Sequence, residues 1–181
     1  MGKKNYRDGL SDSAVTVTLT KEVGHGAEKE VREAVLGSAR KQFQEACAKY
    51  GTRARKDAKQ NLRTSLALFG PRGKFWIQGG EEQDNDEYDA DGEVVELPSS
   101  YCAIGAIHKA NGQAEHLARL AADLAAGELF PNRAMDLAVE YSSPGDELLI
   151  QLPDVVDFND GDDTTFPDVR KVFTRAIELL S

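Results

Sequence analysis

The sequence predicts a mostly helical α+β fold, with about five helices, a small β-hairpin and an N-terminal strand. Apolar residues recur every three or four positions along several stretches, which is the period of an amphipathic helix. Residues 14–20 instead alternate Val and Leu with Thr, which is the period of a half-buried strand. With 40% hydrophobic and 29% charged residues, the 181-residue chain has the composition of a globular protein with one core.

The N-terminal part is predicted to be a flexible tail followed by a strand–helix extension. Residues 1–13 are polar and contain glycine, and the extension covers residues 14–58. Its strand spans residues 14–20, and its helix follows Gly26 and ends at Gly51. The apolar face of this helix contains Val31, Val35, Ala39, Phe43, Cys47 and Tyr50.

A second helix is predicted over residues 52–69, with one apolar and one basic face. The apolar face contains Ala58, Leu62, Ser65, Leu66 and Phe69. The basic face, within residues 53–63, contains Arg55, Lys56, Lys59 and Arg63. Such a stripe is usually a solvated surface, and the alternative is contact with the phosphates of a nucleic acid.

A hairpin is predicted after a turn at residues 70–73. Residues 74–80 and 93–97 are rich in strand-forming residues, and an acidic segment lies between them. The dipeptide Asp91-Gly92 immediately precedes the second of these runs. Because Asp-Gly favours a tight turn, we expect the two runs to pair.

Further helices are predicted over residues 101–110, 113–127, 131–142 and 166–180. Ser99 or Ser100 is the expected N-cap of the first, and Asn111-Gly112 its end. Gly127 is expected to end the second.

The C-terminal part contains one ambiguous segment and one acidic loop. Residues 147–152 are short and apolar, so they form either a strand or part of the helical core. Residues 157–165 are predicted to be an acidic loop, and Thr164 or Thr165 the cap of the last helix. The apolar face of that helix contains Val169, Val172, Phe173, Ala176, Ile177 and Leu180.

Charge is unevenly distributed along the chain. The net charge of −9 divides into +8 for residues 1–74 and −17 for residues 75–181. The two parts either neutralise each other within the fold or meet partners, a nucleic acid for the basic part and a basic protein for the acidic part.

Cys102 is the candidate nucleophile. A thiol near the start of a helix gains thiolate character, but a cysteine enzyme also needs a base within hydrogen-bonding reach. His108 lies about 120° around the helix and about 9 Å along it, which is too far. The small neighbours Ala103, Gly105 and Ala106 favour close helix packing, so we expect a buried Cys102. A cysteine-dependent hydrolase or transferase is the alternative.

No cofactor or metal site is expected. The acidic segment fails the EF-hand pattern, because Glu87 and Pro98 stand where Asp and Glu are required. No phosphate-binding loop, secretory signal or membrane-spanning run is visible. With only two cysteines, we expect a cytoplasmic protein with reduced thiols and no membrane partner.

Several short motifs recur in a familiar order. They comprise Trp76, Gln78 and Gly79, then Asp91 and Gly92, then Tyr101, Cys102, Gly105 and Ala106, and finally Phe158, Asn159 and Asp160. In this order, residues from about 60 to 181 resemble an uncharacterised family of small proteins from actinobacteria and their phages. Phe158 stands where Trp is usual. The resemblance implies a family-like domain over residues 59–181, without a known activity.

The predicted function is that of a non-enzymatic interaction protein. The resemblance implies a phage-encoded accessory protein acting in the host cytoplasm, and the acidic surface suggests a host protein as its partner. Nucleic-acid binding through the basic face is the alternative. We also expect Asn159 or Asp160, which the motif places before the last helix, to bond the start of the Cys102 helix. The sequence makes no prediction of oligomeric state.

Overall fold

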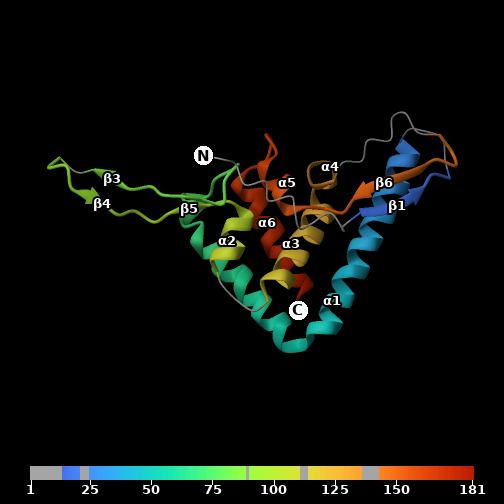
Figure 1. Cartoon of the computed structure of the whole chain (residues 1–181), viewed down its shortest axis with the longest axis horizontal. Coiled ribbons are helices and arrows are strands. Elements are labelled where there is room, and N and C mark those ends of the chain that lie inside the picture. Colours follow the sequence, from blue (N-terminus) through green and yellow to red (C-terminus); the bar gives the residue numbers. More distant parts are fainter. Residues whose placement is uncertain (1–13, 21–24, 89, 111–113, 136–142) are drawn as a thin grey trace.

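The computed structural model describes residues 14–20, 25–88, 90–110, 114–135 and 143–181, and it confirms a mostly helical α+β fold (Figure 1). The predicted tail, the helix end at Asn111-Gly112 and residues 136–142 lie outside the described residues. The helices are α1 (His25–Leu68), η2 (Pro71–Gly73), α2 (Ala103–Lys109), α3 (Glu115–Leu129), α4 (Pro131–Ala134), α5 (Val155–Asp160) and α6 (Phe166–Leu179). The strands are β1 (Ala14–Thr18), β2 (Glu82–Gln83), β3 (Glu87–Tyr88), β4 (Val94–Val95), β5 (Ser100–Tyr101) and β6 (Glu147–Gln151).

Helix α1 is bent into a V at Gly51. This residue has φ 77° and ψ −176°, a conformation that glycine adopts readily because it has no Cβ. The two halves correspond to the two helices predicted on either side of Gly51. Figure 1 shows them as the two limbs of the V, with α3 and α6 between them.

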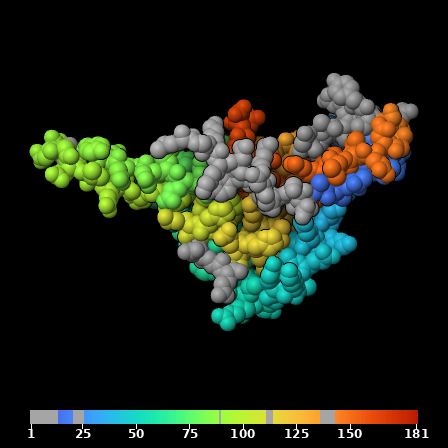
Figure 2. Space-filling model, in the orientation of Figure 1, coloured from blue at the N-terminus to red at the C-terminus, as the bar shows by residue number. Residues whose placement is uncertain are grey.

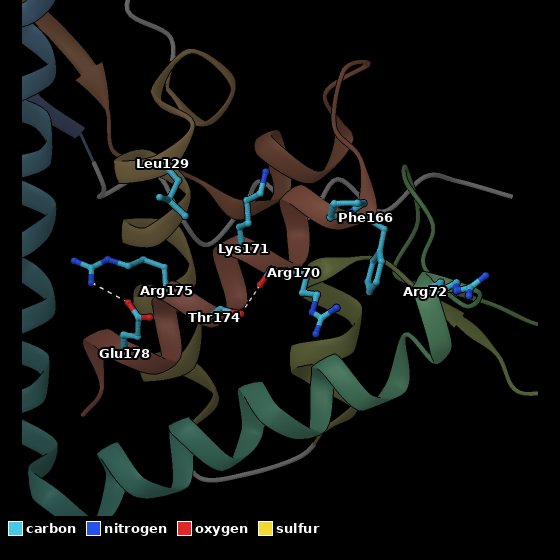
Figure 3. A pocket seen from close by; sticks show the side chains of 9 residues that line it. Arg72, Leu129, Phe166, Arg170, Lys171, Thr174, Arg175 and Glu178 are labelled. Carbon is cyan, nitrogen blue, oxygen red and sulfur yellow. Dashed lines mark hydrogen bonds and ion pairs between the residues drawn. The ribbon is translucent and has the colours of Figure 1, made fainter.

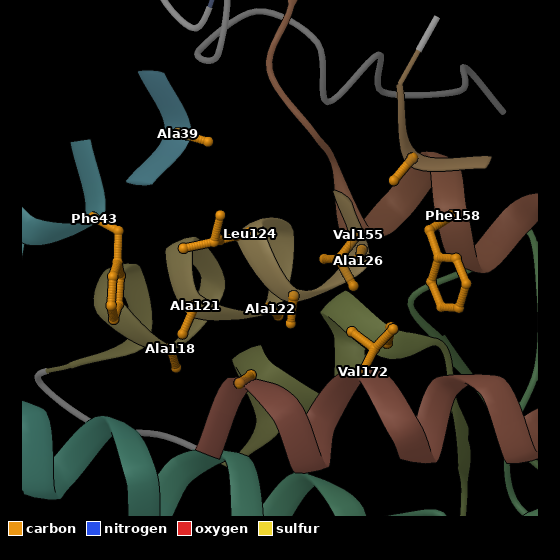
Figure 4. Close-up of a cluster of buried hydrophobic side chains, with 14 of the residues drawn as sticks. Ala39, Phe43, Ala118, Ala121, Ala122, Leu124, Ala126, Val155, Phe158 and Val172 are labelled. Atoms are coloured by element: carbon orange, nitrogen blue, oxygen red, sulfur yellow. The ribbon is translucent and has the colours of Figure 1, made fainter. Parts of the chain in front are cut away.

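The core forms where both limbs of α1 meet α3 and α6. On the first limb the predicted face is buried from Val31 to Phe43, but Tyr50 is 46% exposed, so the face leaves the core near the bend. On the second limb Leu62 and Phe69 are fully buried. Figure 4 shows Phe43 close to the alanine-rich side of α3, where small side chains permit a short interhelical distance.

The ambiguous segment at residues 147–152 contains a strand. Strand β6 pairs antiparallel with β1, with Val15 opposite Ile150 and Val17 opposite Leu148. Val17 and Ile150 are buried, whereas Leu149 is 75% exposed. The predicted N-terminal extension therefore joins the rest of the chain through this ribbon as well as through α1.

The predicted hairpin exists, but its first strand begins later than expected. Strand β3 pairs with β4 around Asp91-Gly92, and Gly92 has φ 83°. Residues 74–80 do not form a strand of this hairpin; they make one parallel bridge, from Trp76 to Tyr101. Strands β2 and β5 pair nearer the body. Figures 1 and 2 show the hairpin projecting from the body as a narrow arm.

Two predicted helix boundaries were wrong. Ser99 and Ser100 precede the N-cap of α2, which is Cys102. Gly127 lies inside α3, where a Cβ atom would be 2.4 Å from Cγ of Pro153, so close packing explains this glycine.

The predicted acidic loop at residues 157–165 was also partly wrong. Its first residues belong to α5, which is capped by the side chain of Asp154. Thr165, one of the two predicted caps, is the N-cap residue of α6. Its hydroxyl donates a hydrogen bond to the side chain of Asp168 and does not bond the backbone. The helix predicted over residues 131–142 ends earlier than expected: α4 stops at Ala134, and the backbone of Met135 is extended.

Gly105 should be the least replaceable glycine of the helices. A Cβ atom at this position would lie 1.8 Å from the carbonyl oxygen of Glu81, so Gly105→Ala requires α2 to move. We expect a loss of about 3 kcal/mol or more in the free energy of unfolding, measured by urea denaturation.

Gly37→Ala is the matched control. Gly37 is an exposed residue of α1, and a Cβ atom added there would have no neighbouring atom within 4 Å. The free energy of unfolding of this variant should rise by about 0.5–1 kcal/mol, because alanine has a higher helix propensity than glycine. A Gly105→Ala protein as stable as the unsubstituted chain would contradict the close approach of α2 to Glu81.

Candidate functional site

Most of the motif residues converge at the start of α2, around the side chain of Asn159, whereas Asp91 and Gly92 lie apart at the turn of the hairpin. Its Oδ1 atom accepts hydrogen bonds from Trp76 Nε1 (2.8 Å) and from the backbone N of Ala103 (3.2 Å). Its Nδ2 atom donates to the carbonyl oxygen of Ile77 (3.3 Å) and to Oδ1 of Asp160 (2.8 Å). The expected bond from Asn159 to the Cys102 helix is therefore present.

Two further motif residues complete this arrangement. Gln78 Nε2 donates to the carbonyl oxygens of Asn159 (2.8 Å) and Gly161 (3.0 Å). Asp160 Oδ1 accepts from the backbone N of Gly79 (2.9 Å). We call these residues the Asn159 network: Trp76, Gln78, Gly79, Ala103, Asn159 and Asp160. Because Asn159 uses both its acceptor and its donor atoms within the protein, the network has the character of a structural junction.

Cys102 lies beside this network as a buried N-cap residue. It is 5% exposed, and its Sγ accepts a hydrogen bond from the backbone N of Gly105 (3.3 Å). Burial raises the pKa of the Cys102 thiol and outweighs the lowering effect of the backbone N–H groups at the helix start. The protonated thiol therefore fills space and caps α2.

His108 is directed toward two carboxylates. Its Nδ1 lies 3.6 Å from Glu81 and its Nε2 lies 3.3 Å from Glu115. His116 packs edge-on against the ring of Tyr50, with ring centroids 6.1 Å apart. His108 thus has partners other than Cys102, in agreement with the helix geometry expected from the sequence, and His116 packs against Tyr50.

The C-terminal half of α2 is held by two polar side chains whose contacts the sequence did not reveal. Asn61 Nδ2 donates to the carbonyl oxygen of Ile107 (3.0 Å), and Ser65 Oγ donates to that of Ala106 (3.0 Å). Both are buried. Their spacing of four residues on an otherwise apolar face was the available signal.

The basic face of α1 is partly engaged within the fold. Arg55 donates to the carbonyl oxygens of Leu180 and Ser181, and Lys59 Nζ donates to Oγ of Ser181 (2.7 Å). Lys56 and Arg63 are exposed. Of the four predicted interaction residues, Arg55 and Lys59 therefore bond the chain at the end of α6, whereas Lys56 and Arg63 face solvent.

The hairpin carries the strongest concentration of charge. Residues 81–97, which we call the acidic arm, include nine Asp or Glu and no Lys or Arg. Tyr88 and Val94 are directly opposite each other on its strands and are 76% and 53% exposed. Asp89, one of the carboxylates in the rejected EF-hand pattern, lies outside the described residues. Within the described part of the chain, no group of three potential ligands is placed to hold a metal ion.

Two carboxyl groups with strongly shifted pKa values serve helix ends. Burial and the neighbouring charge of Asp154 raise the pKa of Asp123 to about 8, and its Oδ1 accepts from the backbone N of Val155 (2.9 Å) at the start of α5. Burial opposes ionisation of Asp168, but hydrogen bonds led by that of Lys171 lower its pKa to about 2. Both shifts arise from burial and from neighbouring groups of the fold.

Asn159→Ala should destabilise the fold. The substitution leaves the N–H groups of Trp76 and Ala103 without their acceptor, at a cost of about 2–4 kcal/mol in the free energy of unfolding. Thermal denaturation should show a lower Tm. Asn85→Ala, which removes an amide at the base of the arm, should lower the free energy of unfolding less, because Asn85 is only partly buried and its hydrogen bonds with described residues reach two neighbouring groups, on Pro98 and Ser100. An unchanged Tm for Asn159→Ala would contradict the structural role.

Thiol labelling should distinguish a packed cysteine from a nucleophile. We expect Cys102 in the native protein to react with a disulfide reagent at least about a hundredfold more slowly than in urea, because it is buried and its pKa is raised. Cys47→Ser removes the second thiol, which is only partly buried, so that the signal reports Cys102 alone. Rapid native labelling would restore the cysteine-enzyme alternative.

Comparison with known proteins gives one match. The DUF6197 family, described as a family of unknown function, matches residues 53–179. These residues extend from just beyond the bend at Gly51 to the end of α6. Searches among curated proteins and solved structures gave no match. None of the described helices is long and apolar enough to cross a membrane. The chain therefore belongs to the DUF6197 family of unknown function.

Proposed function

We propose that this chain is a non-enzymatic interaction protein that binds a basic host protein through the acidic arm. In this proposal it is a phage-encoded accessory protein that acts in the cytoplasm of its host. The observation that carries the proposal is the arm itself, a projecting hairpin with nine carboxylates and an exposed apolar pair (Figure 2).

Near the base of the arm, two carboxylates lie close to basic side chains of α2. Lys109 Nζ lies 3.1 Å from Glu82, and His108 lies near Glu81. Nearer the tip, Glu87 and Glu96 are exposed and form no side-chain hydrogen bond or ion pair with any described residue. Uncompensated charges on a narrow projection attract a basic partner and accelerate its encounter.

The apolar residues of the arm add contact area that charge alone does not supply. Tyr88 and Val94 lie on one face of the hairpin, and Val95 lies opposite Glu87 on the other. An exposed aromatic residue surrounded by polar groups is typical of the centre of a protein–protein interface. A two-stranded hairpin without a covering layer is only marginally stable, and docking would stabilise it.

The other candidate surfaces support a function less well. The basic face uses Arg55 and Lys59 to bond the end of α6, which leaves Lys56 and Arg63 for a nucleic acid. Cys102 is buried and protonated. The arm, by contrast, leaves Tyr88, Val94 and the carboxylates of Glu87 and Glu96 exposed to a partner.

The test compares two variants with the same net charge. Glu87→Lys with Glu96→Lys changes the arm, and Glu33→Lys with Glu45→Lys changes exposed carboxylates of α1; each pair of substitutions takes the net charge from −9 to −5. Proteins retained from an actinobacterial extract are identified, and the retained basic protein is purified. Its Kd is then measured by calorimetry at two salt concentrations.

We expect the arm variant to bind this purified protein at least about tenfold more weakly, and the α1 variant within about twofold of the unsubstituted chain. Binding should also weaken as salt rises. Equal affinities for the two variants would refute the role of the arm.

A further inference from the structure

A groove along α6 complements the acidic arm in both charge and apolar character. It encloses about 660 Å³ and is lined by Arg72, Leu129, Phe166, Pro167, Arg170, Lys171, Thr174, Arg175 and Glu178 (Figure 3). This volume lies in the range of known ligand sites. The lining combines an apolar wall with four cations and one carboxylate.

The four cationic side chains of the groove differ in whether they form ion pairs with described residues. Lys171 bonds Asp168 (3.1 Å), and Arg175 bonds Glu128 (3.0 Å) and Glu178 (3.2 Å). Arg72 and Arg170 are exposed and form no side-chain hydrogen bond or ion pair with the residues that the structure describes. These two guanidinium groups are available to carboxylates, which they bind in a bidentate geometry.

We propose that the groove receives the acidic arm of a second copy of this chain. Glu87 and Glu96, which lack partners in the described part of their own chain, would pair with Arg72 and Arg170 of the neighbouring copy. Tyr88, on the face of the hairpin opposite Glu87, would contact Phe166 and Pro167 in the groove. The proposal rests on the arm being a docking element, and it adds the groove as its receptor.

The dimensions of the two surfaces agree. The part of α6 that lines the groove runs from Phe166 to Glu178, which is about 18 Å at 1.5 Å per residue. The described strands of the arm tip, Glu87–Tyr88 and Val94–Val95, are each about 7 Å long at about 3.3 Å per residue. The hairpin tip therefore fits lengthwise along the groove.

The contact must join different molecules, because the arm points away from the body that contains α6 (Figure 1). It is also heterologous, since the arm and the groove are different surfaces, so it generates a ring or a chain of copies. The net charge of −9 opposes association at long range. At about 0.15 M salt this repulsion is screened beyond about 8 Å, whereas direct ion pairs persist.

The test uses analytical ultracentrifugation of the full chain and of two complementary variants. The arm variant carries Glu87→Lys and Glu96→Lys, and the groove variant carries Arg72→Glu and Arg170→Glu. We expect the unsubstituted chain to form dimers and larger species at about 0.15 M salt, and to dissociate at about 1 M. Each variant alone should be monomeric.

An equimolar mixture of the two variants should associate again. The Glu-bearing arm of the groove variant meets the intact groove of the arm variant, and the Lys-bearing arm of the arm variant meets the Glu-bearing groove of the groove variant, so opposite charges face each other in both contacts. A control with Lys56→Glu and Arg63→Glu, which has the same net charge as the groove variant, should associate as the unsubstituted chain does.

Two results would overturn the proposal. The first is an unsubstituted chain that stays monomeric at every concentration, which would leave the binding of a basic host protein by the arm unaffected. The second is association that survives in either variant, because it would place the contact on another surface. Loss of host-protein binding in the arm variant without any self-association would support the proposed function and refute this inference.

Discussion

The side chain of Asn159 is the constraint on which the rest of the structure depends. One amide bonds groups from the segment after η2, from the start of α2 and from the end of α5, which are far apart in the sequence. Each bond contributes only about 1 kcal/mol when made, but a missing partner in a buried position costs more. The network therefore fixes the relative positions of these three segments more firmly than its number of bonds suggests.

The position of the acidic arm follows from this junction. Ile77 accepts from Asn159 and donates its own backbone N–H to Tyr101, so the chain that leads into the arm is held on both sides. Four residues later, the carbonyl of Glu81 lies against Gly105 and accepts from Cys102. The small residues of α2 thus provide a rigid base from which a thin hairpin can project.

Sequence periodicity predicted the elements that local composition determines. The β1 strand and the buried face of α6 follow from apolar spacing. The division of α1 follows from the helix-ending glycine Gly51, and the burial of Cys102 follows from its small neighbours. Contacts between residues far apart in the sequence were not predictable in this way. Gly127 resembles a helix-ending glycine, yet it lies inside α3 and packs closely against Pro153. For the same reason, the sequence could not show which side chains of the basic face bond the chain at the end of α6 and which face solvent.

The family match and the fold together show how the chain is extended. Strand β6 lies within residues 53–179, whereas its partner β1 precedes them. The first limb of α1 also precedes the matched region, and it covers α3. The extension therefore completes both a sheet and a core that belong to the family region. Since Gly51 alone turns the chain between the two parts, one left-handed glycine joins the added limb to the family fold.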